Sequence, residues 1–439
     1  MRFKIIFILI FISILNSDFV FGQQKPTQPD SINPYKNIET YSKRNKFNKF
    51  MYRLIFKPVP ISSPKKKVKK KVNKKLVQKP YSSFEGKIIR HINIITLDQF
   101  GYSVSDTFVV SQNLISTAGN KLHVKSQHIT IRNLLLIRQN QPFNSMLVKE
   151  SERLVRSMGY VHDVSFFVVA TSKKSDSVDI FIRELDNWSI ILDGALSTSN
   201  FNVNLTDNNF SGLGHRFQGG YKRNFTNGIN AYKANYYIPN IKNTFISTTL
   251  HYEIDGYKNS NKSLSIDRPF YSTFAKWAGG ASITSQFVQD SINNSYLINV
   301  PFLILGFRTQ DYWAGFAQQI FKGNTETERA TNLIFAVRYL SVQYFKKPSE
   351  LNDPLRIYSN EDFYLAGIGI STRKYVQDKY VFKFGVTEDV PVGRVYGLTG
   401  GYQVRNDIGR WYAGLRVSYG NYHNWGYLSC VFDYGTFFH

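Results

Sequence analysis

Cysteine, acidic residues and long apolar runs are all scarce in this sequence of 439 residues. The single cysteine, Cys430, excludes an intramolecular disulfide framework and a cysteine-based zinc site. Outside residues 1–22, no apolar run reaches the roughly 20 residues that a transmembrane helix requires. The Gly-x-Ser-x-Gly, His-Glu-x-x-His and Gly-x-x-x-x-Gly-Lys motifs are also absent, so a secreted enzyme is the least favoured class. We predict no catalytic, cofactor-binding or metal site, and we expect surface or structural roles for His91, His123, His128 and His162.

The first 22 residues have the pattern of an export signal. Arg2 and Lys4 precede the apolar stretch Ile5–Leu15, which is too short to span a bilayer. Val20-Phe21-Gly22 then offers a cleavage site for signal peptidase. The alternative interpretation is an N-terminal membrane anchor. Export argues against nucleic acid as a partner, although 55 basic against 31 acidic residues give a net charge of +24.

The positive charge is concentrated in one segment. Residues 23–85 carry a net charge of +14, whereas residues 86–439 carry only +9. Dense like charges repel one another and oppose folding, so we predict a basic disordered linker over 23–85. It is either a solvated spacer or an electrostatic tether to lipid head groups or anionic envelope polymers. The tether candidates are Lys65, Lys66, Lys67, Lys69, Lys70, Lys71, Lys74 and Lys75.

Residues 86–186 have the pattern of a small α+β module. Apolar residues alternate with polar ones at Ile88–Ile94, and residues 127–138 carry a helical apolar stripe. Asn144 is suited to cap a helix that Gly159 would stop. Two strands follow, at Val161–Ala170 and Ser177–Leu185. The predicted order is therefore strand, helix, helix, strand, strand.

Residues 187–439 alternate between apolar and polar side chains, which is typical of strands with two unlike faces. The segments are about 9–12 residues long, as tilted membrane-spanning strands are. Aromatic residues make up 15% of the chain and lie near predicted strand ends, as in the girdles of membrane barrels. We predict a transmembrane antiparallel β-barrel; the alternative is a soluble sandwich or propeller. Clear examples are Tyr232–Ile238, Ile246–Ile254, Tyr364–Ile370, Phe382–Val386, Trp411–Tyr419 and Leu428–Tyr434, with turns at Asn224–Asn227, Lys258–Lys262 and Asn421–Asn424.

Several stretches resemble the outer-membrane assembly and translocation superfamily, the BamA/TamA-like or bacterial surface antigen proteins, in their Bacteroidetes-like form. The likeness is carried by Gly86–Ile92, Thr96–Gly101, Ile131–Leu135, Gln141–Phe143, Glu150–Arg156, Gly159–Val161, Asn209–Gly214 and Gly385–Gly393. In this resemblance Gly212 and Gly214 belong to a turn between early barrel strands.

The resemblance implies a periplasmic POTRA-type module followed by a barrel in the outer membrane of a Gram-negative bacterium. It further implies that the protein inserts or exports client polypeptides without a cofactor. Outer-membrane lipid and unfolded outer-membrane proteins are then the expected partners. The implied domains are a signal peptide (1–22), the linker (23–85), the module (86–186) and the barrel (187–439).

The sequence also departs from this family. We count ten to thirteen strands, fewer than the sixteen of the complete family, and no Arg-Gly dipeptide supplies its lid-loop motif. We therefore expect the final part of the family barrel to be missing, either through truncation of the gene product or in a smaller barrel. A passive outer-membrane pore or a structural surface antigen is the alternative function.

Overall fold

The computed structural model describes residues 78–105, 114–172, 175–290, 303–323 and 325–438. The predicted export signal, nearly all of the basic linker and its eight candidate tether lysines lie outside these ranges. By compactness the chain divides into Met1–Val72 and Asn73–His439, and every described residue belongs to the second unit.

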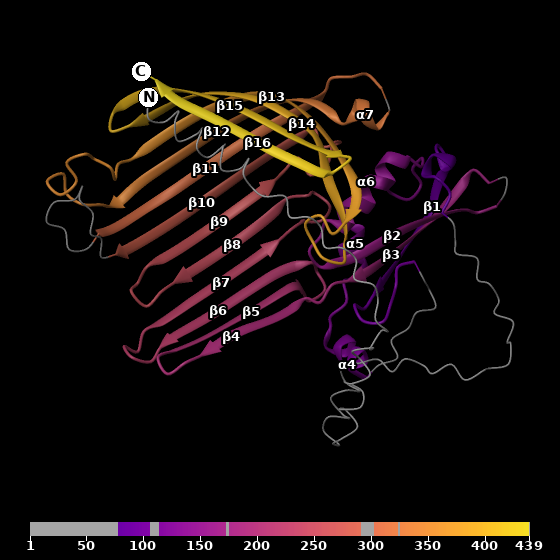
Figure 1. Cartoon of the computed structure of the whole chain (residues 1–439), viewed down its shortest axis with the longest axis horizontal. Helices are drawn as coiled ribbons and strands as arrows, with labels where there is room; N and C mark the ends of the chain where they lie inside the picture. Colours follow the sequence, from indigo (N-terminus) through magenta and orange to yellow (C-terminus); the bar gives the residue numbers. More distant parts are fainter. Residues whose placement is uncertain (1–77, 106–113, 173–174, 291–302, 324, 439) are drawn as a thin grey trace, which may run out of the picture. The chain divides into compact units, whose positions relative to one another are not determined.

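The first part of this unit is a small α+β module with a three-stranded sheet (Figure 1). The strand order is β1-β3-β2, in which β1 runs parallel and β2 antiparallel to β3. The elements are η1 (Tyr81–Phe84), β1 (Ile88–Leu97), α4 (Leu114–Leu122), α5 (His128–Arg132), α6 (Ser145–Arg156), β2 (Val161–Ala170) and β3 (Ser177–Asp186).

The module has its own hydrophobic core. Alternate residues of β3, including Val178, Ile180 and Ile182, are fully buried, as the period of two requires. They belong to one buried cluster with Val148 and Val155 of α6. The predicted strand–helix–helix–strand–strand order is confirmed, with α4 as an additional helix that the sequence pattern did not reveal.

Two predicted helix boundaries in the module are wrong. The helix expected over 127–138 ends at Arg132, because Leu134 and Leu135 donate to carbonyls three residues back and Leu136 N–H donates to Ser151 Oγ instead. The next helix begins as predicted, with the Asn144 side chain accepting from two backbone N–H groups. It ends at Arg156, two residues before the end expected just ahead of Gly159, since the Met158 N–H donates to the Val155 carbonyl three residues back.

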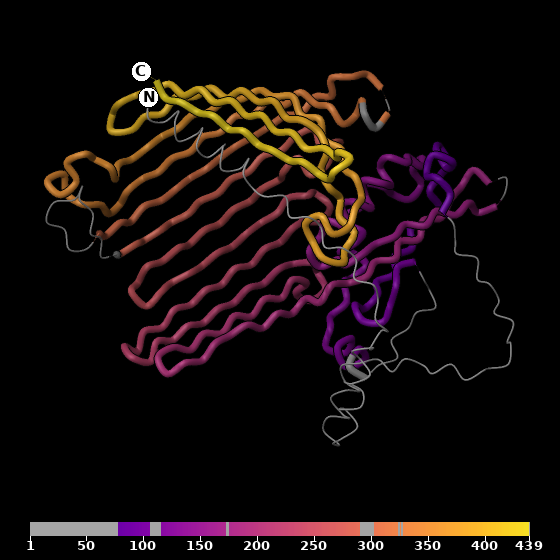
Figure 2. Tube along the Cα trace, viewed as in Figure 1, coloured from indigo at the N-terminus to yellow at the C-terminus, as the bar shows by residue number. Residues whose placement is uncertain are grey.

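The remainder of the unit is one thirteen-stranded antiparallel sheet in which each strand pairs with its neighbours in sequence. Figure 2 shows this order as a continuous colour change from β4 to β16. Its elements are β4 (Ile190–Leu196), β5 (Asn200–Phe210), β6 (His215–Asn224), β7 (Asn230–Ile238), β8 (Ser247–Ile254), β9 (Ser260–Arg268), β10 (Trp277–Asp290), β11 (Leu303–Gln319), α7 (Glu326–Arg329), β12 (Thr331–Lys346), β13 (Glu361–Lys379), β14 (Thr387–Arg405), β15 (Ile408–His423) and β16 (Gly426–Phe438).

The two faces of the sheet differ, as the alternation predicted. Ile368 of β13 lies opposite Leu398 of β14, which in turn lies opposite Leu415 of β15. We call the face that bears these residues the apolar face. Glycines and polar residues, such as Gly397 and Thr399, occupy the other face. Large side chains of the apolar face are exposed to an unusual degree; examples are Leu192, Leu250, Leu264, Ile266, Tyr364, Ile368, Leu398, Trp411 and Phe432.

The strand predicted at Phe382–Val386 is wrong. These residues form the connection between β13 and β14, and Gly385 there has a φ of +77°. The reason is a side chain outside the predicted strand. The carboxylate of Glu388 accepts hydrogen bonds from the backbone N–H groups of Val381, Phe382 and Lys383, which would otherwise pair with a strand.

Strand lengths and the sheet edges also differ from expectation. β13 and β14 each span 19 residues, and β15 continues through the predicted turn to His423. Among the described strands, β4 pairs only with β5 and β16 pairs only with β15. The antiparallel sheet is thus confirmed, whereas its closure into a barrel is not observed within the described residues.

Candidate functional site: the junction between module and strand ends

The turn that contains Gly212 and Gly214 docks on the module. Backbone N–H of Gln127 donates to the Gly212 carbonyl at 2.9 Å, and Thr130 Oγ1 donates to the same oxygen at 2.8 Å. Both glycines have positive φ, +72° and +69°. A Cβ on Gly212 would lie 2.3 Å from the Lys125 carbonyl oxygen, and one on Gly214 would lie 2.6 Å from the Tyr160 ring. Backbone conformation and close contact therefore both require glycine.

A buried polar network holds the same turn. Asp186 at the end of β3 accepts from Ser126 N–H at 2.8 Å and from Ser126 Oγ at 2.5 Å. The His123 Nε2 atom lies 3.0 Å from the Asp186 carboxylate. Asn209 donates to Ser126 Oγ at 3.0 Å and accepts from Gly214 N–H at 2.8 Å. His123 thus has a structural role, and the network joins the module to the β5–β6 turn.

The loop between β7 and β8 makes a second attachment. Phe245 belongs to the hydrophobic core cluster of the module and stacks on Tyr271, with ring centroids 3.8 Å apart. The Asn243 side chain donates to the carbonyls of Asn133 and Leu135, at 2.6 and 3.0 Å. These contacts satisfy carbonyls beyond the end of α5, where no helical donor is available.

Arg156 of α6 is a buried cation bound from both sides. It is 8% exposed, contacts Glu152 at 2.5 Å and binds both carboxylate oxygens of Asp389 in β14, at 2.8 and 3.0 Å. Burial raises the pKa of the Glu152 carboxyl, with Arg156 acting in the opposite direction. The Tyr81 hydroxyl lies 3.0 Å from the other oxygen of Glu152. A buried charge of this kind is tolerated only with its partners in place.

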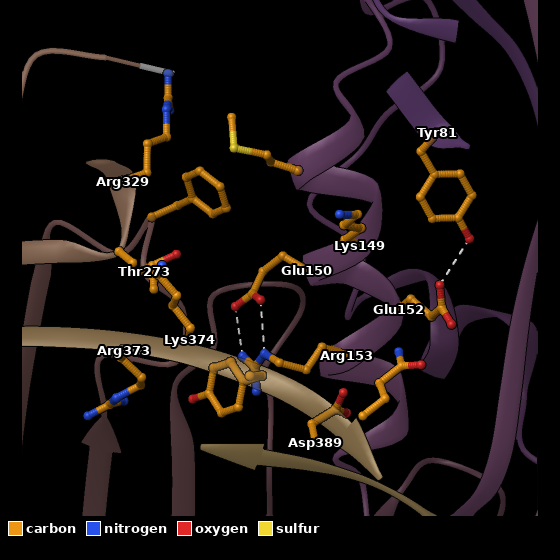
Figure 3. Close-up of a pocket in the computed structure, with 15 residues that line it drawn as sticks. Tyr81, Lys149, Glu150, Glu152, Arg153, Thr273, Arg329, Arg373, Lys374 and Asp389 are labelled. Carbon is orange, nitrogen blue, oxygen red and sulfur yellow. Dashed lines mark hydrogen bonds and ion pairs between the residues drawn. The ribbon is translucent and has the colours of Figure 1, made fainter. Parts of the chain in front are cut away.

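Arg153, one helical turn earlier, makes a parallel attachment. It donates two hydrogen bonds to Glu150, at 2.7 and 2.9 Å, and one to the Tyr271 carbonyl at 2.7 Å. Its guanidinium lies 4.3 Å from the centroid of the Tyr375 ring in β13. Figure 3 shows the paired bonds between Glu150 and Arg153 beside this ring. One face of α6 therefore contacts the β9–β10 loop, β13 and β14.

A cavity of about 500 Å³ lies at this junction. In Figure 3 the α6 side chains lie on one side, and residues from the large sheet and its connections lie on the other. Five cationic side chains and three carboxylates line it: Lys149, Arg153, Arg329, Arg373 and Lys374, with Glu150, Glu152 and Asp389. None of these residues is recognisable as a site from the sequence, because they come from segments far apart in the chain.

The described residues offer two further observations about chemistry. They contain no group of three or more His, Cys, Asp or Glu side chains placed to hold a metal ion. No helix among them has both the length and the hydropathy needed to cross a membrane. Cys430 is exposed on β16.

No protein-family model and no curated protein matches this chain. Among solved structures it is similar to BamA from Haemophilus ducreyi lacking POTRA domains 1–3, with 12% identity, 80% of this chain and 81% of that chain covered, and a TM-score of 0.30. It is also similar to CdiB from Acinetobacter baumannii, with 11% identity, 93% and 96% coverage and a TM-score of 0.29. Likenesses with TM-scores this low carry no argument about function, which rests on the geometry of the chain itself.

Proposed function

We propose that this chain is an outer-membrane β-barrel protein of the barrel-assembly or polypeptide-translocation class, with a POTRA-type module in the periplasm. The exposed apolar face of the sheet supports a bilayer environment, because a soluble protein rarely leaves so many large apolar side chains in water. The attachments of α5 and α6 support a module held at one end of the strands.

The direction in which the two edge strands run is the main support for the proposal that a client strand pairs with the sheet. Every neighbouring pair from β4 to β16 is antiparallel, so these two edges of the sheet, twelve pairings apart among the described strands, run in the same direction. Single-chain bacterial barrels instead have an even number of strands, all antiparallel. One strand added between β4 and β16 would be antiparallel to both. A client polypeptide is the partner that could supply it.

The edge strand β16 is suited to such pairing. It is 13 residues long, and its described residues from Ser429 to Phe438 are all exposed. Its outer N–H and C=O groups have no second strand to pair with among the described residues. In hydrocarbon, unpaired backbone groups are strongly unfavourable, which would favour capture of an extended segment.

The experiment places a photo-crosslinking amino acid at Phe432 in β16 and, as a control, at Leu398 on the same face of the interior strand β14. Both side chains are exposed, at 57% and 61%. In proteoliposomes supplied with a small unfolded barrel protein, we expect an adduct at Phe432 and none at Leu398, and depletion in cells should lower outer-membrane protein levels. Equal adducts at both positions, or unchanged protein levels, would contradict client handling.

A passive pore is the second candidate, and the residues opposite the apolar face favour it. Gly367, Gly369 and Gly397 lie on that face of β13 and β14, so a closed sheet would have little side-chain volume there. Steady conductance in planar bilayers, together with no adduct at Phe432, would support the pore over client handling.

A further inference from the structure

We propose that the junction cavity binds a phosphate-bearing anion. Five cations line it: Lys149 and Arg153 from α6, Arg329 at the end of α7, and Arg373 and Lys374 from β13. Against three carboxylates, the lining has a net charge of +2. Cations gathered from three separate elements of the fold focus a positive potential in a cavity whose walls are protein.

Each of the three carboxylates at the cavity is bound by an arginine. Glu150 is engaged by both guanidinium donors of Arg153. Glu152 and Asp389 both bind Arg156, which is buried beside the cavity. Because Arg156 adds a further positive charge next to two of the three carboxylates, the negative charge in the lining is largely compensated.

The size and the donor types favour phosphate. A volume of about 500 Å³ accommodates a small molecule or a lipid head group but not a folded domain. Guanidinium groups match phosphate oxygens with two parallel hydrogen bonds, and ammonium groups add point charges. A phosphate offers three or more acceptor oxygens in a compact group, which suits a lining with cations from α6, α7 and β13.

The cavity is lined by residues other than those of the edge strands β4 and β16, so phosphate binding there does not depend on client handling. Two sources share the chemistry: a soluble phosphate compound and the head group of an anionic phospholipid. Lipid head groups carry phosphate at the membrane surface, close to the ends of spanning strands.

The test is calorimetric titration of the full chain in a non-ionic detergent with inorganic phosphate and with pyrophosphate. We expect saturable binding with a Kd below about 1 mM for pyrophosphate, and weakening at high salt. The double variant Arg373→Gln/Lys374→Gln should bind at least about tenfold more weakly, since two charges near the ligand are lost. Arg373→Lys keeps the charge but loses the paired donors of the guanidinium, so its affinity should fall between that of the original chain and that of the double variant.

The matched control is Lys222→Gln/Lys233→Gln, which removes two exposed charges from β6 and β7 outside the cavity. It should bind as the original chain does, and circular dichroism checks that every variant is folded. Titration with glycerol phosphate and with phosphatidylglycerol in mixed micelles separates the two sources, and saturable binding of either supports the proposal. Absence of saturable binding, equal losses in both double variants, or tighter binding of polyglutamate than of pyrophosphate would overturn it.

Discussion

At the scale of single residues, Glu184 is the most informative ionisable group of the module. It is fully buried on β3, two residues before Asp186. Burial, followed by the charge of Asp186, raises the pKa of Glu184 well above its ordinary value. The folded state therefore binds this proton more tightly than the unfolded state. The stabilisation that comes from this proton is fully present below the pKa that Glu184 has in the unfolded chain. It is lost as the pH rises through the pKa of Glu184 in the folded state.

Glu184→Gln should consequently stabilise the module at neutral and alkaline pH. We expect the free energy of unfolding to rise by at least about 1 kcal/mol at neutral pH, since one pKa unit corresponds to about 1.4 kcal/mol. This increase should disappear towards about pH 4. Urea unfolding followed by circular dichroism across this range measures it. Glu350→Gln, at a side chain that is 81% exposed, is the control and should change little. A gain that does not vary with pH would contradict the assignment.

At the scale of elements, α6 is attached to β14 by the ion pair between Arg156 and Asp389. Asp389→Ala leaves Arg156 buried with Glu152 as its remaining carboxylate partner, and should lower the free energy of unfolding by about 1–3 kcal/mol. It should also speed proteolytic release of the module. Asp433→Ala is the matched control, because its 3.6 Å contact with Arg416 joins side chains that are 59% and 60% exposed. In that variant the free energy of unfolding should fall by less than about 0.5 kcal/mol. Equal decreases in the free energy of unfolding for the two variants would show that the buried ion pair does not stabilise the attachment of the module.

At the scale of the whole molecule, the question is whether β4 and β16 meet when no other strand is present. If the proposed bilayer environment is right, unpaired backbone groups at both described edges are unfavourable. We then expect the isolated chain to close through a parallel seam between β4 and β16, limited by the seven residues of β4. Cys430 of β16 offers a direct probe, because a disulfide requires Cα atoms within about 7 Å. After mild oxidation, Leu192→Cys or Leu196→Cys in β4 should crosslink to Cys430.

Leu398→Cys is the control for this experiment, since β14 is separated from β16 by β15. Closure should also give a band of altered mobility on unheated denaturing gels. If no β4 position crosslinks and heating does not change the mobility, the sheet remains open in the isolated chain.

Local pattern was sufficient to determine much of this protein. The period of two identified the strands, and Asn144 marked the start of α6, because alternation and capping depend on residues close together in the chain. Gly212 and Gly214 had been assigned to a turn only through a family resemblance, and no local pattern indicated their proximity to Lys125 and Tyr160.

Only the tertiary structure decided where the candidate site lies and how the sheet ends. Arg156 and Asp389 are 233 positions apart, and neither has a local pattern that points to the other. The connection at Phe382–Val386 had the alternation of a strand, but Glu388 holds its backbone in another conformation. Such choices depend on which distant groups meet after folding, since hydrogen bonds and charge pairs in a buried junction are set by three-dimensional proximity and not by sequence spacing.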